Sequence, residues 1–198
     1  DSSGRLMSYQ DAGTVTIQGP YSETGNDGII AWGRAVIDTG GESGLQPFHY
    51  ALGTPVPNPN DISSKVATYS LISGGATKPT DSFSGLQASF SLVSADITAN
   101  FSSGAVSGGL GWSNQLTAGF SGSIVDGGQK FSGSGLTSSS SGGTLNVDGF
   151  FAGTNAARAG LIYLLNDSEF GSYIGAAALA QTNLSDAELR LVITDGPQ

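Results

Sequence analysis

Apolar and polar residues alternate in short runs along most of the chain, and glycine, serine or proline separates one run from the next. Residues 65–73 (KVATYSLIS) and 95–101 (ADITANF) show the alternation clearly, with the period of a strand that buries one face. The recurrence of such runs every ten residues or so is typical of barrels and sandwiches. The pattern predicts strands at 14–19, 29–38, 46–53, 65–73, 86–112 (three strands), 116–124, 129–137, 147–153, 161–165, 172–180 and 187–193.

Helical signals are scarce. Residues 154–160 predict one helical turn, because alanine favours helix, Asn155 can cap its start and Gly160 can end it. Residues 185–191 fit a short helix or a strand, and we favour a strand at 187–193. The sequence Asp-Gly-Gly at 126–128 predicts a hairpin turn between two strands.

In the predicted strands every second residue is mostly small or polar, so one face of the sheet should be solvated and the other buried. A sheet of many strands must protect its edges, and closure into a barrel does so. We therefore expect an all-β fold, an antiparallel eight-stranded β-barrel with extra N-terminal strands packed alongside. Phenylalanine, leucine, isoleucine and valine at alternate positions favour an interior filled by side chains.

The length of 198 residues fits a single domain, 1–198. Within it we expect N-terminal strands and loops at 1–45, the barrel core at 46–182, and a C-terminal strand or tail at 183–198. The 31 glycines suit many short strands with tight turns, since glycine reaches the positive φ values that turns require.

The formal net charge is −9, with only seven lysines and arginines, so the chain lacks the clustered cations that nucleic acids and anionic membranes attract. There is no cysteine, which excludes disulfides, thiolate metal sites and thiol catalysis. No apolar stretch is long enough for a transmembrane helix. We expect neither a nucleic-acid partner nor a membrane-spanning helix.

One region carries a family resemblance. The segment GFFAGTNAARAGLIYLL at 149–165, followed by SYIGAAALA at 172–180, resembles the closing strands of transferrin-binding-protein-B-type β-barrels. ADITANFSSGAVSGGLGW at 95–112 resembles the paired strands upstream in that barrel. GIIAWGRAVID and QPFHYALGTPVP, within 28–57, resemble the start of barrels joined to some FecR-type regulatory proteins of Gram-negative bacteria.

This resemblance implies an eight-stranded barrel, sometimes beside a smaller handle sheet. It also implies export to the periplasm or cell surface, and binding of host proteins or haem without catalysis. The chain departs from the family in having no cysteine to carry a lipid anchor.

The candidate ligand-binding residues are few. His49, the only histidine, is either a structural residue of its strand or an axial haem ligand. Trp32 and Arg34 lie two apart and therefore on one face, where they form a sheet-covering pair or a surface contact. Trp112 ends a strand, and together with Trp32 it is the only hint of sugar stacking. No metal site is indicated, and the carboxylates at Asp81, Asp96, Asp126, Asp148 and Asp167 mostly fit turns.

The chain has no G-x-S-x-G nucleophile elbow, and we predict no catalytic residues and no enzyme activity. We expect a binding or interaction module of a Gram-negative cell-envelope protein, on the cell surface, in the periplasm or secreted. It would recognise a protein partner through its outer barrel face and the loops at 20–28, 54–64 and 74–82. Two alternatives stay open, a haem carrier that uses His49 and a carbohydrate-binding protein, and the sequence leaves a small-molecule ligand undecided.

Overall fold

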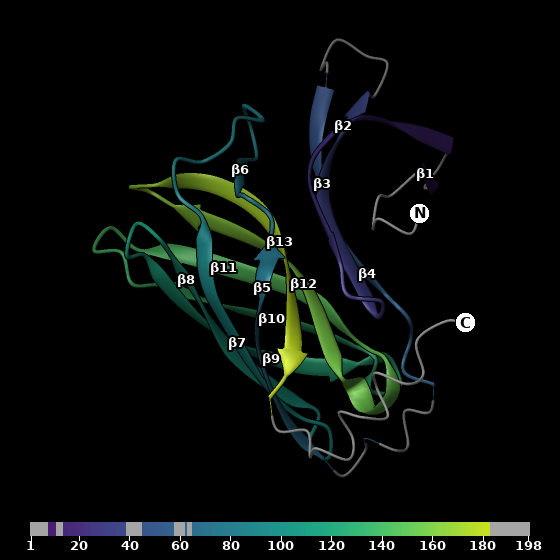
Figure 1. The fold of residues 1–198 in the computed structure, drawn as a ribbon. Coiled ribbons are helices and arrows are strands. Elements are labelled where there is room, and N and C mark those ends of the chain that lie inside the picture. The colour runs from purple at the N-terminus through teal and green to yellow at the C-terminus, as the bar shows by residue number, and fades with distance from the viewer. Residues whose placement is uncertain (1–7, 11–13, 39–44, 58–61, 63–64, 183–198) are drawn as a thin grey trace.

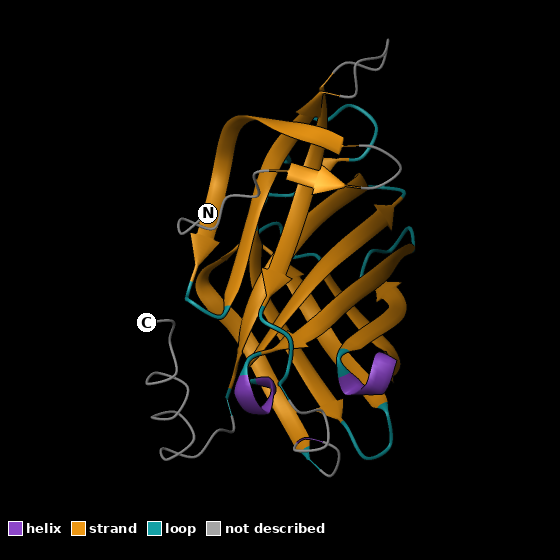
Figure 2. Ribbon diagram, turned by 90° about the vertical axis from the view of Figure 1, so that its right-hand side faces the viewer, coloured by secondary structure: helices purple, strands orange, loops and turns teal. Residues whose placement is uncertain are grey.

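The computed structural model describes residues 8–10, 14–38, 45–57, 62 and 65–182, which fold into two antiparallel β-sheets (Figure 1). One sheet closes on itself as a barrel, and the other lies along the outside of that barrel (Figure 2). The expected all-β fold, a closed eight-stranded antiparallel barrel with N-terminal strands packed alongside, is confirmed.

The barrel strands follow each other around the wall in chain order, and the last strand pairs with both the one before it and the first, which closes the cylinder. A two-residue strand, β6, is added at one end of the last strand. The strands are β5 (Val66–Ala76), β6 (Thr80–Asp81), β7 (Leu92–Asn100), β8 (Ala105–Trp112), β9 (Thr117–Val125), β10 (Lys130–Thr137), β11 (Gly143–Ala152), β12 (Arg158–Asp167) and β13 (Gly171–Gln181).

The N-terminal sheet has three long strands, with the three-residue β1 added at its edge. Its strands are β1 (Ser8–Gln10), β2 (Thr14–Asn26), β3 (Ile30–Asp38) and β4 (Leu45–Gly53). Two sequence-based assignments change here. Most of the loop expected at 20–28 is strand, because β2 continues to Asn26. Residues 46–53, placed at the start of the barrel core, pair with β3, and the barrel begins at Val66.

Two smaller expectations also change. The stretch 86–112 forms two strands, since residues 86–91 make only a single bridge, between Thr80 and Gln87. The helical turn expected at 154–160 is a 3₁₀ turn, η3 (Thr154–Ala156), in which Asn155 takes a positive φ of 57° and no side chain caps the start. The strand expected at 187–193 lies outside the described residues. The turn expected at Asp-Gly-Gly is confirmed as η2 (Asp126–Gly128), which connects β9 to β10.

Alternate residues of each barrel strand point inward and fill the cylinder, as the sequence predicts. On β11 the inward residues Leu145, Val147 and Phe151 are each at most 1% exposed. The Phe151 ring contacts those of Tyr69 and Phe131, with centroids 5.5 and 5.0 Å away. Burial of aromatic rings in such clusters contributes much of the stability of a small core.

Glycines permit the tight curvature of β9 and β10. A Cβ atom on Gly135 would lie 1.7 Å from the carbonyl oxygen of Gly119, and one on Gly122 would lie 1.9 Å from that of Ser132. No side chain fits at those distances, so the backbones approach each other only because both residues are glycine. At Gly119 itself, the nearest atom to an added Cβ would be 3.9 Å away.

The outer surface of β13 is also built from small residues where the N-terminal sheet covers it. Ala176 and Ala178 point outward and are nevertheless fully buried. Ile30 and Trp32 of β3 pack on Ala178 in a separate apolar cluster with Ile72 and Phe150. The alanine-rich sequence of β13 thus serves two buried faces, the barrel interior and the junction with the N-terminal sheet.

Candidate functional site

Four connections gather at one end of the barrel, residues 77–91, 113–116, 138–142 and 168–170. We call these connections, together with Asp167 at the end of β12, the rim. Hydrogen bonds join neighbouring members. Ser113 N–H donates to the carbonyl of Ser91, and the Ser168 hydroxyl donates to the carbonyl of Ser141. The rim is therefore a connected surface carried by the rigid barrel, the usual position of binding residues in such a scaffold.

The first rim connection holds two apolar side chains out in solvent. Phe83 is 88% exposed and Leu86 is 70% exposed. Asp81 fixes the turn between them, since its Oδ1 accepts hydrogen bonds from the backbone N–H of Phe83 at 3.0 Å and of Ser84 at 2.6 Å. The carbonyl of Asp81 accepts the N–H of Gly85, whose φ of +70° suits glycine. The phenylalanine is thus presented by an ordered turn.

The base of this connection is anchored to the barrel. Ser82 bonds to Ser172 of β13 twice, backbone to backbone at 2.9 Å and hydroxyl to hydroxyl at 2.8 Å. Further along, Phe90 is buried and its ring meets that of Tyr173 edge-on at 4.9 Å. The segment therefore has a buried, packed base and an apolar tip that nothing in the described chain covers.

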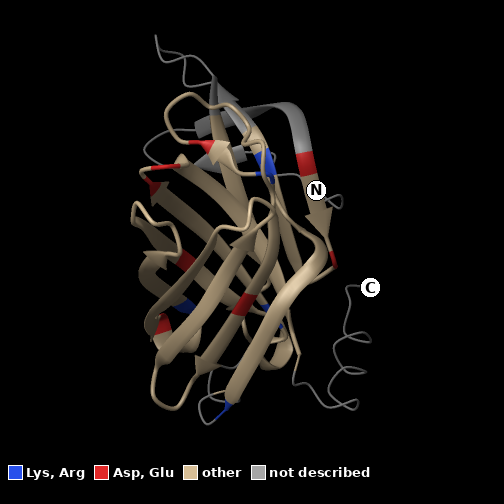
Figure 3. Cartoon of the chain, turned by 90° about the vertical axis from the view of Figure 1, so that its left-hand side faces the viewer, with Lys and Arg blue, Asp and Glu red and all other residues tan. Residues whose placement is uncertain are grey.

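The rim is acidic. Its described charged side chains are Lys78, Asp81, Asp167 and Glu169. Hydrogen bonds from the backbone and hydroxyl of Ser84 lower the pKa of Asp81. Burial raises the pKa of Asp167, but hydrogen bonds from the Thr137 hydroxyl and from nearby backbone N–H groups outweigh it and leave that pKa lowered. In Figure 3 several acidic positions lie toward this end, while the wall below has few charges.

The three predicted site residues lie elsewhere, at the junction between the N-terminal sheet and the barrel. His49 is 5% exposed, with Nδ1 2.8 Å from the Thr77 hydroxyl and Nε2 2.9 Å from the Thr80 hydroxyl. Burial, and next the charge of Arg34, lower the pKa of His49 to about 3, so the imidazole is neutral. An axial haem ligand needs one ring nitrogen for iron, whereas both nitrogens of this residue already have partners.

Trp32 and Arg34 accompany His49 on the side of the sheet that faces the barrel. Arg34 pairs directly with His49 across β3 and β4 and is 9% exposed. Trp32 is 7% exposed and donates its indole N–H to the carbonyl of Gly74 at 3.0 Å. Trp112 is 2% exposed, inside the barrel, where its ring meets that of Tyr163 edge-on at 5.6 Å. Neither tryptophan presents a face on which a sugar could stack.

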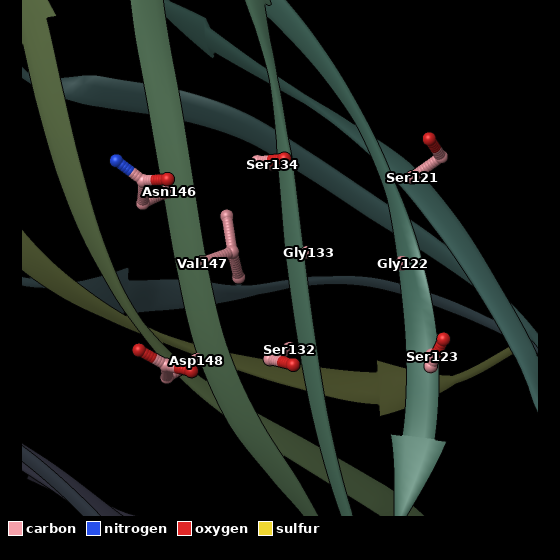
Figure 4. Close-up of a pocket in the computed structure, with 9 residues that line it drawn as sticks. All are labelled: Ser121, Gly122, Ser123, Ser132, Gly133, Ser134, Asn146, Val147 and Asp148. Atoms are coloured by element: carbon pink, nitrogen blue, oxygen red, sulfur yellow. The ribbon is translucent and has the colours of Figure 1, made fainter.

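The barrel wall carries a shallow depression of about 420 Å³ on the outer side of β9, β10 and β11 (Figure 4). Short polar side chains line it in register, Ser121 beside Ser134 and Ser134 beside Asn146. Ser123, Ser132 and Asp148 form the next row. Regular rows of exposed hydroxyls are what a solvated sheet face requires. The exposed apolar side chains of these strands, Val125 and Leu136, lie near the strand ends and outside the lining of the depression.

Of the three loops expected to contact a partner, only 74–82 reaches the rim. The β2–β3 turn lies at the opposite end, where Asp27 forms an ion pair with Arg158 at the start of β12. Residues 54–57 lie there too, since Pro55 bridges to Ala152 at the end of β11; of 58–64, only Ile62 is described. Phe83 and Leu86 were not among the predicted residues. The available signal was two large apolar residues inside a Ser- and Gly-rich loop.

No family model and no curated protein matches the sequence. Solved structures match the fold. One described as a surface lipoprotein aligns with a TM-score of 0.52 at 15% identity, over 82% of each chain. A transferrin binding protein B (TbpB) variant from Actinobacillus pleuropneumoniae aligns with a TM-score of 0.53 at 12% identity, over 83% of each chain.

The isotype 1 TbpB of serogroup B Neisseria meningitidis aligns with a TM-score of 0.51 at 16% identity, over 88% of this chain and 35% of that one. The chain thus spans about a third of the meningococcal protein. The fold is that of a TbpB-type barrel domain, as the sequence resemblance implied. Among the described residues, no helix has the length and apolar character needed to cross a membrane.

Proposed function

We propose that the chain is a non-catalytic protein-binding module of a Gram-negative cell-envelope protein, and that it recognises its partner through the rim. The observation that carries the proposal is Phe83, 88% exposed on a turn that Asp81 holds in one conformation. An aromatic side chain in a preorganised turn is a typical anchor of a protein interface, because little conformational entropy is lost when it enters a pocket.

The surroundings of Phe83 favour a protein over other partners. Leu86 supplies a second apolar contact, and the acidic side chains Asp81, Asp167 and Glu169 lie on the same rim. An apolar centre with a polar border is the usual composition of an interface. The same carboxylates would repel an anionic membrane surface and a second copy of this rim. A partner with an apolar pocket and basic or neutral surroundings fits this end best.

The structural neighbours support the same class and location. Two of them are called transferrin binding proteins and one a surface lipoprotein, so their names describe binding and a place at the cell surface. Transferrin is therefore the first soluble protein to test as a partner.

The experiment places a photo-crosslinking amino acid at position 83, with position 98 as the matched control. Thr98 is exposed on β7, in the polar wall away from the rim. Each labelled chain is irradiated with purified transferrin and, separately, with a bacterial envelope extract. We expect an adduct of defined mass from position 83 and none from position 98. Equal adducts from both positions, or none from position 83 in either mixture, would contradict the proposal.

A further inference from the structure

Hydrogen bonds with Trp32, Glu23 and His49 hold the segment that leads into the Phe83 turn against the N-terminal sheet, and Pro47 of that sheet lies close to Gly85. Trp32 bonds to the carbonyl of Gly74, and the Glu23 carboxylate accepts the backbone N–H of Lys78 at 2.6 Å. His49 bonds to Thr77 and Thr80. Near the tip, an added Cβ on Gly85 would lie 3.3 Å from Cδ of Pro47. Residues 74–85 therefore follow the N-terminal sheet along most of their length.

The His49 contact is the most specific of these. The neutral imidazole has one N–H donor and one nitrogen acceptor, and it finds a threonine hydroxyl on each side. Thr77 and Thr80 are each at most 1% exposed, so the three groups form a closed buried network. Thr77 also accepts the backbone N–H of Ala176 at 2.9 Å, which ties the network to β13. Loss of one member would leave a buried polar atom without its partner.

The barrel holds the other side of this segment. β6 pairs with β13 at Thr80 and Asp81, and Ser82 bonds to Ser172. In Figure 1, β6 lies between the end of the barrel and the N-terminal sheet. The sheet thus supplies the second wall against which the segment is fixed.

We propose that the N-terminal sheet positions the rim turn, through His49 and Glu23, so that the sheet and the Phe83 turn act as one binding unit. In this view His49 and Glu23 are positioning residues that need not touch the partner. That the turn is a binding surface rests on the proposed function; that the sheet holds it does not. The test therefore uses the protein without any partner.

The experiment is hydrogen–deuterium exchange on two variants. Thr80→Val keeps the side-chain shape but removes one bond to His49, and Glu23→Ala removes the acceptor for Lys78 N–H. The amides to follow are those of Asp81, Gly85 and Ala88, whose hydrogen bonds close the turn. Loss of one or two buried hydrogen bonds should accelerate their exchange by about five- to thirtyfold.

The matched control is Thr68→Val, the same chemical change at a site that loses a bond to Thr182 at the opposite end of the barrel. It should leave exchange in the turn unchanged. All three variants should leave the amides shared by β9 and β10 protected. If the turn amides of both Thr80→Val and Glu23→Ala exchanged at the wild-type rate, the proposal would be overturned. So would an equal acceleration in β9 and β10, since that would report global destabilisation.

Discussion

Two parts of the same barrel wall differ in what covers them. On β13 the outward residues Ala176 and Ala178 are fully buried beneath the N-terminal sheet, whereas on β9 the outward residues Ser121 and Ser123 face solvent. Both strands keep an apolar inner face. The polarity of the outward-facing residues of a strand therefore indicates whether a second layer packs on it. A strand with apolar residues on both faces is covered by a second layer, and a strand with serines on its outer face is exposed to solvent.

A charge placed on each wall should give the largest contrast. Ala178→Asp buries a carboxylate against Ile30 and Trp32 with no partner, and we expect it to destabilise the fold by about 3 kcal/mol or more. Ser121→Asp puts the same group in water and should cost less than about 1 kcal/mol. Urea unfolding of both variants measures the difference. Similar midpoints for the two would mean that the N-terminal sheet does not seal this face.

Glycines of the bare wall provide the next contrast. Gly135→Ala would force a Cβ into the carbonyl of Gly119, and we expect a loss of about 2–3 kcal/mol because two backbones must separate. Gly119→Ala meets nothing closer than 3.9 Å and should change stability by less than about 0.5 kcal/mol. Thermal unfolding followed by circular dichroism compares them. If Gly119→Ala proved as damaging as Gly135→Ala, close backbone approach would not be the cause.

These contrasts explain how far the sequence could predict the fold. The alternation of apolar and polar residues along β9 and along 95–101 is visible within each short segment. The strands and the filled barrel could therefore be predicted. The place of residues 46–53 could not, because their pairing with β3 or with a barrel strand depends on contacts distant in sequence. His49 illustrates the same limit, since its partners Thr77 and Thr80 lie 28 and 31 residues further along. A lone histidine in a strand gives no sign of them.

The rim tip was missed for another physical reason. Phe83 and Leu86 have the composition of core residues, and nothing local distinguishes an apolar residue that packs from one that does not. Phe90, seven positions after Phe83 in the same connection, is buried against Tyr173. Only the Asp81 turn, seen in three dimensions, separates the exposed phenylalanine from the buried one.

The buried junction between the N-terminal sheet and the barrel should also affect how stability depends on pH. The pKa of His49 is lowered from 6.5 to about 3 by burial and then by Arg34, so in this window the unfolded chain binds a proton that the folded chain does not. Stability present above pH 6.5 is therefore lost as the pH falls toward 3, by up to about 1.4 kcal/mol per pH unit.

Urea unfolding at pH 7, 6 and 5 tests this group, because the lowered pKa values of Asp27, Asp81 and Asp167 keep the titration of those three carboxylates in the folded protein at lower pH. His49→Gln should be less stable at pH 7 and should lose part of the slope between pH 6.5 and 5. An unchanged slope in this variant would mean that water reaches the imidazole and that the junction is not sealed.

The smallest effect on stability is expected at Phe83, the most exposed large apolar side chain among the described residues. Phe83→Ser removes an aromatic ring that is 88% exposed, so the free energy of unfolding should change by less than about 0.5 kcal/mol. Phe90→Ser in the same connection removes a buried ring and should cost about 3 kcal/mol or more. If the rim binds a partner, the two variants rank the other way in affinity, measured at a temperature where both are folded. Phe83→Ser then weakens binding by tenfold or more, a typical loss for an interface anchor, and Phe90→Ser weakens it less. A large drop in unfolding midpoint for Phe83→Ser would instead show that its ring is packed in solution, and the tip would then belong with the covered surfaces.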